Sequence, residues 1–195
     1  DKGKPAFSYK IYGNIANYFE NETDLVDFFE FQKGQQVAEV GTGNGHNIAG
    51  FSLISDSISF YAQDIDIKAL NEKSFAKALD KVKKYKSSNT CTFKLCIGTE
   101  KATNLPVASF DKIILSASFH EFTFIDEMLS DIYKKLKPGG KLYVVESKCL
   151  AKTHKNYTSE EVIGFAEKNR FKLAKKDGKD LNGSSGLYRL IFSKQ

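Results

Sequence analysis

The sequence predicts an α/β protein with a doubly wound, mostly parallel seven-stranded sheet and an antiparallel C-terminal hairpin strand. Three observations support this. Short apolar and β-branched runs alternate with helix-like stretches from residue 37 to about residue 146. Gly41, Gly43 and Gly45 lie between the first apolar run and a helix-like segment. The last two strand-like runs, 170–177 and 187–194, are joined by a segment too short for a crossover helix.

The core elements follow in order along the chain. We expect helices between successive parallel strands because such strands need crossover connections. The expected strands cover 36–40, 58–65, 90–98, 110–118 and 141–147, and the expected helices cover 46–54, 67–85 and 126–137. In the third strand, Cys91 and Cys96 are an odd number of residues apart, which places them on opposite faces of the sheet.

The flanking segments are predicted from their end signals. Residues 12–20 and 24–32 read as two helices ahead of the core, and 159–169 reads as a helix with Ser159 as its N-cap. Pro138 cannot continue the helix before it, and Gly139 or Gly140 can take the left-handed cap.

Composition limits the class of protein. The 195 residues suit one domain, and 41% hydrophobic with 27% charged residues is ordinary for a globular chain. The sequence contains no run of about 18 apolar residues, so no membrane span is predicted. The first residues also lack the apolar core of a signal peptide. The odd number of cysteines, without zinc-site spacing, predicts a reducing, cytoplasmic location and no metal site.

The net charge of +5 comes from lysines scattered along the chain. The densest runs, 77–86, 134–141 and 168–179, fit solvated helix faces or strand edges. A nucleic-acid partner is therefore permitted by the charge but not indicated by it.

The glycine loop admits two interpretations. The nicotinamide fingerprint G-x-G-x-x-G would need a third glycine where His46 stands. The spacing is instead E-x-G-x-G-x-G, beginning at Glu39. In this respect the chain resembles the class I methyltransferases that use S-adenosylmethionine, a family with a Rossmann-like fold.

The resemblance implies which residues hold that cofactor. Bare backbone at the three glycines would let the methionine and ribose portions lie against the loop, and Glu39 would face the cationic end. Asp64, at the end of the second strand, would accept hydrogen bonds from both ribose hydroxyls. The full set of implied cofactor-binding residues is Glu39, Gly41, Thr42, Gly43, Asn44, Gly45, Asp64, Ile65, Thr99, Glu100 and Ser116.

Asp66 competes with Asp64 for the ribose, because it lies two residues further along the same strand face. We favour Asp64 and expect Asp66 to cap the helix over 67–85. An acid at this position does not by itself separate methyltransferases from nicotinamide enzymes.

Further downstream, Phe110–Asp111 and the segment 137–140 also resemble the family. The acid expected just after the third strand is displaced, however, to Glu100 in the segment Gly98–Thr99–Glu100. Adenine recognition is therefore expected from Glu100 or Thr99.

Methyl transfer requires mainly alignment of the acceptor, with a general base only if the acceptor must lose a proton. His120, in the turn after the fourth strand, is the candidate base and a candidate substrate contact, although it could equally cap the next helix. Tyr18 is a second candidate substrate contact. His46 reads as a surface residue, and His154 lies where a lid could form.

The predicted organisation is one domain over 1–195, with a helical cap (1–36), a cofactor-binding core (37–146) and a C-terminal helix and hairpin (147–195). The predicted activity is methyl transfer to a small molecule. An RNA or protein methyltransferase and a non-catalytic cofactor-binding protein remain alternatives. Oligomeric state is not predicted.

Overall fold

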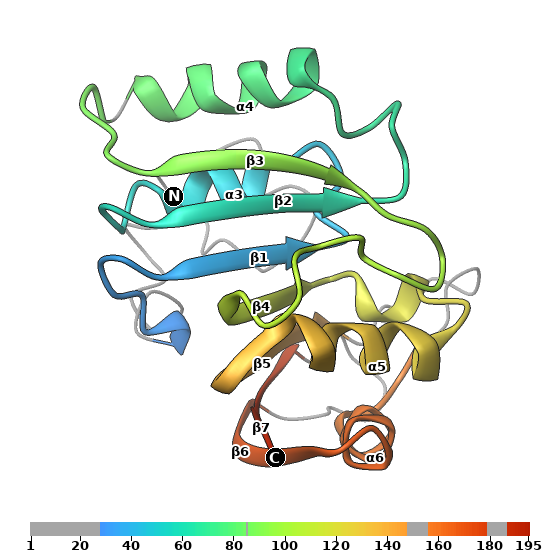
Figure 1. The fold of residues 1–195 in the computed structure, drawn as a ribbon. Coiled ribbons are helices and arrows are strands. Elements are labelled where there is room, and N and C mark those ends of the chain that lie inside the picture. Colours follow the sequence, from blue (N-terminus) through green and yellow to red (C-terminus); the bar gives the residue numbers. More distant parts are fainter. Residues whose placement is uncertain (1–27, 85, 148–155, 179–186) are drawn as a thin grey trace, which may run out of the picture.

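The computed structural model describes residues 28–84, 86–147, 156–178 and 187–195. These residues form a seven-stranded sheet in the order β3-β2-β1-β4-β5-β7-β6 (Figure 1). Strand β7 runs antiparallel to both of its neighbours, and the other pairs are parallel. The strands are β1 Gln36–Val40, β2 Ser59–Asp64, β3 Thr92–Ile97, β4 Phe110–Ser116, β5 Leu136–Ser147, β6 Phe171–Gly178 and β7 Leu187–Lys194. The predicted fold class is confirmed.

Helices cover both faces of the sheet. The helices α3 (His46–Phe51) and α4 (Glu72–Lys83) pack on one face, and α5 (Ile125–Lys135) and α6 (Ser159–Lys168) pack on the other. In Figure 1, α3 lies behind the strands and α5 in front of them. Neighbouring strand residues such as Ile113 and Ile114 point into different clusters, so each strand contributes to two apolar cores.

The central strands are buried and the edges are not. Ala38 and Leu115 are fully enclosed because β1 and β4 have strands on both sides and helices on both faces. The edge strand β3 alternates between exposed and half-buried residues. Cys91, just before β3, packs against the cluster under α3 and α4, and Cys96 packs against the opposite cluster, as predicted.

The predicted start of one helix and the predicted N-cap of another are wrong. Helix α4 begins at Glu72 rather than 67, because Asn71 forms a capping box with Ser74. Helix α6 is capped by Thr158 rather than Ser159, since the Thr158 hydroxyl accepts from the N–H of Glu161.

Predicted helix ends also differ from the structure, since α3 ends at Phe51 rather than 54 and α4 ends at Lys83 rather than 85. Helix α5 ends at Lys135, where Leu136 turns extended and pairs with Phe110. The segment 137–140 therefore lies inside β5 and is not a helix cap. Gly139 does adopt a positive φ, 75°, as predicted for a left-handed glycine. The helix predicted over 24–32 ends at residue 29, because Glu30 adopts a φ of 48°.

Candidate functional site

A pocket of about 780 Å³ opens at the carboxyl ends of the strands. It lies where the strand order reverses between β1 and β4, because the chain leaves β1 for one face of the sheet and β4 for the other. The described residues that line it are 40–44, 46, 47, 63–66, 69, 81, 100, 116–118, 121–123 and 128.

The glycine loop needs its glycines for different reasons. Gly41, Gly43 and Gly45 have φ of 74°, 59° and 79°, in the left-handed region that glycine adopts without strain. A Cβ at Gly41 would lie 2.5 Å from the Cβ of Ser118, and one at Gly45 would lie 2.4 Å from the Phe75 ring. At Gly43 a Cβ would meet nothing within 4 Å, so this backbone faces open space at the pocket wall.

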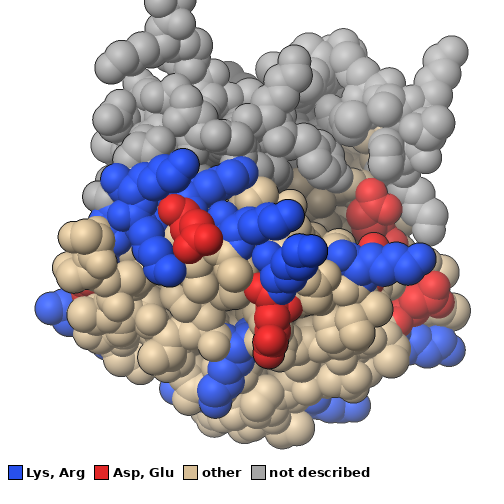
Figure 2. Space-filling model, turned by 90° about the horizontal axis from the view of Figure 1, so that it is seen from above, with Lys and Arg blue, Asp and Glu red and all other residues tan. Residues whose placement is uncertain are grey.

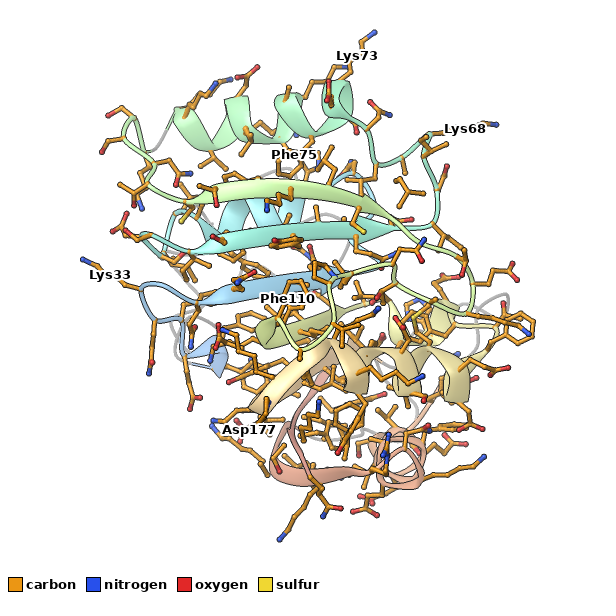
Figure 3. All side chains as sticks on the ribbon, viewed as in Figure 1. Lys33, Lys68, Lys73, Phe75, Phe110 and Asp177 are labelled. Atoms are coloured by element: carbon orange, nitrogen blue, oxygen red, sulfur yellow. The ribbon has the colours of Figure 1, made fainter. Side chains whose placement is uncertain are left out.

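Phe75 of α4 packs against the glycine loop at Gly45. It extends from α4 toward the sheet (Figure 3) and is buried. Its ring fills the space that a side chain at Gly45 would need. The N–H groups of Gly41 and Thr42 both donate to the carbonyl of Gln63, at 2.9 and 3.0 Å. The loop is therefore fixed between β2 and α4.

The Asp64 carboxylate is held in place by two backbone donors. Its Oδ2 accepts from the N–H of Gly43 at 2.7 Å, and its Oδ1 accepts from the N–H of Asp66 at 2.9 Å. The side chain is half-buried and lines the pocket. Each carboxylate oxygen retains a lone pair for a donor on a ligand.

Asp66 does not cap α4, contrary to the prediction. Its Oδ1 accepts from the N–H of Lys68 at 2.8 Å, and its carbonyl accepts from Ala69 and Leu70. These bonds form a separate turn before Asn71 caps the helix. Asp66 is exposed and also lines the pocket, so both acids of this strand end are present there.

Glu39 lies behind the pocket wall. It is fully buried and accepts hydrogen bonds from the hydroxyl of Thr42 and from Nδ2 of Asn47. Asn47 Nδ2 also lies 3.3 Å from Oγ of Ser116. Burial raises the pKa of Glu39 to about 7, although the bonds from Thr42 and Asn47 lower it. Glu39 therefore orients side chains that line the pocket.

His120 lies between two carboxylates. It belongs to a short 3₁₀ turn, η2 (Phe119–Glu121), that follows β4. Its Nδ1 lies 2.9 Å from Oε2 of buried Glu146, and its Nε2 lies 3.2 Å from Oε1 of Glu121. The hydrogen bond to Glu146 raises the pKa of His120, against the opposing effect of burial. His120 is beside the pocket, whose wall resumes at Glu121.

Of the two residues predicted to recognise adenine, only one lines the pocket. The Thr99 hydroxyl accepts from the N–H groups of Lys101 and Ala102 and shapes the local turn. Thr99 is not among the described pocket residues, whereas Glu100 is. His46 also lines the pocket, and burial together with Lys81 lowers its pKa.

Most of the predicted cofactor residues meet at this pocket. Those that line it are Gly41, Thr42, Gly43, Asn44, Asp64, Ile65, Glu100 and Ser116. Those that do not are Glu39, Gly45 and Thr99, and the candidate base His120 does not line it either. Tyr18 and His154 lie outside the described residues.

Asn47 and Gln63 are among the pocket residues that the sequence did not predict. Asn47 joins Glu39 to Ser116, and Gln63 is a buried amide whose Nε2 has no hydrogen-bond partner in the described part of the chain. The available signal for Gln63 was a polar residue at the end of an otherwise apolar strand.

No described helix is long and apolar enough to cross a membrane. Within the same residues, no group of three or more His, Cys, Asp and Glu side chains could hold a metal ion.

A sequence profile of the methyltransferase domain matches residues 38–144, which is more than half of the chain. The chain belongs to the methyltransferase domain family. The matched region of this methyltransferase runs from β1 into β5 and includes the glycine loop and Asp64. The predicted resemblance to class I methyltransferases is confirmed, and the nicotinamide interpretation of the loop is not supported.

One curated protein is similar to part of the chain. The chain is 28% identical over 129 residues to phosphoethanolamine N-methyltransferase 2 of Caenorhabditis elegans. The alignment covers 66% of this methyltransferase but 28% of the relative, so the chain spans less than a third of that protein.

Solved structures share the fold at low identity. An S-adenosylmethionine-dependent methyltransferase from Aquifex aeolicus has a TM-score of 0.66 at 20% identity, over 88% of each chain. Phosphoethanolamine N-methyltransferase 2 of Haemonchus contortus, in complex with S-adenosylmethionine, has a TM-score of 0.67 at 16% identity, covering 96% of this chain and 56% of that one. The [4+2]-cyclase SpnF has a TM-score of 0.68 at 15% identity, covering 90% and 81%. The presence of a cyclase means that fold alone does not fix the reaction.

Proposed function

We propose that this chain transfers a methyl group from S-adenosylmethionine to a small-molecule acceptor. The observation that carries the proposal is Asp64, whose carboxylate is fixed by the N–H groups of Gly43 and Asp66 at the wall of a pocket of about 780 Å³. A carboxylate fixed in this way suits a cis-diol, which donates two hydrogen bonds at once.

The pocket fits the remaining parts of the cofactor. Bare backbone at Gly43 leaves open space against which the ligand would lie. Asn47 and Ser116 would offer polar side chains to its amino-acid portion, and Glu39 accepts a hydrogen bond from Asn47. When bound, S-adenosylmethionine supplies an activated methyl group on a sulfonium sulfur that leaves as a neutral thioether.

The protein's own part is to align the acceptor, exclude water and hold a proton where one is released. We assign the last role to His120. Glu146 accepts from Nδ1, which keeps the ring oriented and directs the proton-accepting role to Nε2. Because both ring nitrogens face carboxylate oxygens, His120 is protonated at low pH and becomes a base only above its raised pKa.

The proposed acceptor is a small amine that carries an anionic group. The phosphoethanolamine N-methyltransferase relative supports this class, although only at 28% identity. Lys81, which lines the pocket, supplies a positive charge for the anionic group. A protonated amine must lose a proton before it attacks, which gives His120 its role. Tyr18 as a substrate contact and a cytoplasmic location remain parts of the proposal.

One observation favours an alternative acceptor, RNA. Basic side chains gather on the surface seen from the α4 side (Figure 2). Lys73 and Lys77 on α4 are exposed, and Lys73 points away from the body of the protein in Figure 3. Retention on RNA that weakens steeply with added salt would favour an RNA acceptor, because phosphate contacts release counterions. Cofactor binding without turnover across amines, RNA and peptides would instead favour the non-catalytic alternative.

The test is calorimetric titration with S-adenosylhomocysteine beside NADH. Wild type and Asp64→Ala are compared, with Asp66→Ala as the matched control because it removes the neighbouring carboxylate. We expect wild type and Asp66→Ala to bind S-adenosylhomocysteine and Asp64→Ala to lose binding. Binding of NADH alone, or of neither ligand by wild type, would overturn the proposal. Loss of binding in Asp66→Ala alone would transfer the diol role to Asp66.

A further inference from the structure

Glu121 lies between the proposed base and the pocket. Oε1 of Glu121 is 3.2 Å from Nε2 of His120, the nitrogen assigned the proton-accepting role. Glu121 lines the pocket, whereas His120 is not among the described residues that line it. The Glu121 side chain is 56% exposed and that of His120 only 14%. An acceptor in the pocket would therefore meet the carboxylate before it meets the imidazole.

The turn that carries Glu121 is fixed by central strands of the sheet. The hydroxyl of Ser118, just before η2, donates to the carbonyl of Val40 on β1 at 2.7 Å. The N–H of Phe119 donates to Glu146 on β5, also at 2.7 Å. The N–H of Glu121 itself donates to the carbonyl of Ser118 at 3.1 Å. The position of the Glu121 backbone is therefore set by β1 and β5.

The charges on the pocket wall favour a cationic ligand. The carboxylates among the described lining residues are those of Asp64, Asp66, Glu100 and Glu121, and Lys81 is the one lysine in that set. A cleft lined mainly by one sign of charge concentrates ligands of the opposite sign. Glu121 follows β4, as the proposed base does, whereas the other three carboxylates follow β2 and β3 or end β2. Glu121 is therefore the described lining carboxylate nearest in the chain to the base.

We propose that Glu121 is a catalytic residue, which binds the ammonium group of the acceptor and passes one of its protons to Nε2 of neutral His120. This inference rests on the proposed methyl transfer to an amine. An N–H bond of the ammonium breaks and an O–H bond forms on the carboxylate, while the nitrogen keeps the electron pair that attacks the methyl group. The O–H bond then breaks as an N–H bond forms at Nε2. The resulting imidazolium releases its proton to water before the next turnover.

The surroundings of the two side chains suit these two steps. A carboxylate has lone pairs on both oxygens, so one group can accept from an ammonium and face a ring nitrogen. Charged groups that face His120 come from its own turn, Glu121, and from β5, Glu146, and both raise its pKa. The imidazole is therefore a better final acceptor of the proton than a carboxylate.

The first experiment measures binding without turnover. Protein saturated with S-adenosylhomocysteine is titrated calorimetrically with 2-aminoethyl phosphate as the probe amine. Glu127→Gln is the matched control, because Glu127 lies on α5, is 49% exposed and is not among the described pocket residues. We expect Glu121→Gln to bind the probe about 10-fold more weakly, because it loses a charged hydrogen bond, and the control to bind it as wild type does.

The second experiment measures turnover of the same probe against pH. At neutral pH, Glu121→Gln should lower kcat by about 100-fold or more, which is the usual scale of proton removal by a positioned group. The deficit should shrink as the pH rises toward the pKa of the amine, because a neutral amine needs no base. Glu121→Asp keeps the carboxylate and should recover part of kcat. A role in packing alone predicts the same deficit at every pH.

A double variant tests whether the two side chains act in series. Glu121→Gln combined with His120→Asn should be no slower than the slower of the single variants, because groups that act as one unit are not additive. Additive losses would overturn the proposed transfer from Glu121 to His120.

The remaining outcomes separate the inference from the function on which it rests. If Glu121→Gln matches wild type in probe affinity and in kcat at neutral pH, the inference is wrong while the cofactor assignment stands. A loss of affinity for S-adenosylmethionine but not for S-adenosylhomocysteine would assign the carboxylate to the sulfonium and also overturn the inference. If wild type binds no S-adenosylhomocysteine, or methylates no amine, the proposed function itself fails. Binding of S-adenosylhomocysteine by each variant shows that it is folded.

Discussion

The Nδ1 atom of His120 lies 2.9 Å from Oε2 of Glu146, and the other oxygen of the same carboxylate accepts from the N–H of Phe119 at 2.7 Å. One buried side chain on β5 thus fixes both the ring of His120 and the turn that carries it. The position of His120, the proposed base, is therefore set by Glu146 on a core strand, although His120 itself lies in a turn.

This pair predicts a pH profile. His120 must be neutral to accept a proton, so kcat/KM should rise with pH through its raised pKa, which lies above 6.5. Glu146→Gln removes the charge that favours the imidazolium and should move this rising limb to lower pH. The measurement is kcat/KM against pH for both proteins. An unchanged limb in the variant would assign the titration to another group.

The same pair contributes to stability with a definite sign. A histidine whose folded pKa is raised stabilises the folded state fully below its unfolded pKa and loses that contribution as pH rises through the folded value. Wild type should therefore lose more stability than Glu146→Gln as the pH rises above 6.5, as measured by urea unfolding.

The glycine loop predicts two different failures. Gly41→Ala places a methyl group against Ser118 and should lower the free energy of unfolding by about 1–3 kcal/mol through overpacking, in addition to about 1–2 kcal/mol for the left-handed backbone. Gly43→Ala meets no neighbour and should cost only the backbone part, about 1–2 kcal/mol. Because its methyl group enters the open space at the pocket wall, however, it should lose S-adenosylhomocysteine affinity. Equal stability losses in the two variants would contradict this division.

Glu39 predicts a pH dependence of stability. Its pKa is raised by burial to about 7 from 4.5, so its favourable contribution is complete below pH 4.5 and disappears as pH rises through about 7. Glu39→Gln should remove this slope, which is worth on the order of 3 kcal/mol over the window. Urea unfolding from pH 4.5 to 8 would test it. Parallel curves for wild type and variant would mean that Glu39 stays ionised throughout.

Lys112 predicts the opposite slope at higher pH. It is 4% exposed, donates to the hydroxyl of Tyr143 at 3.1 Å, and has a pKa lowered by burial to about 8. The folded state therefore binds fewer protons than the unfolded state between about pH 8 and 10.5, and stability rises with pH there. Lys112→Met should be more stable than wild type at pH 7 by roughly 1–3 kcal/mol, with the difference shrinking toward pH 10.

The sequence predicted the strands of the fold well, because buried parallel strands are short apolar runs that can be recognised one at a time. Helix ends were harder. Asp66 and Asn71 are both good capping residues, and the difference between them lies in the turn that Asp66 forms with Lys68. That turn depends on the end of β2, which sequence spacing does not reveal.

Residues that line the pocket were predicted where their place at a strand end indicates it, as for Gly43 and Asp64. Residues were missed where their place in the site depends on a contact with another element of the fold. Asn47 is distant in sequence from Ser116, and the solitary amide of Gln63 is recognised only from what surrounds it. His120 was predicted as a base, but Glu146, its partner from the next strand along the sheet, was not.

The two outer strands have a consequence for how copies of this chain meet. Among the described residues, β3 and β6 end the sheet, and the backbone groups on their outer sides have no strand partner and could in principle extend the sheet into another molecule. Lys94 on β3 and Lys172, Lys175 and Lys176 on β6 are exposed. Pairing the edge strands of two molecules would bring these lysine ammonium groups together and remove them from water. Lysines in these positions therefore oppose end-to-end polymerisation while leaving the pocket unaffected.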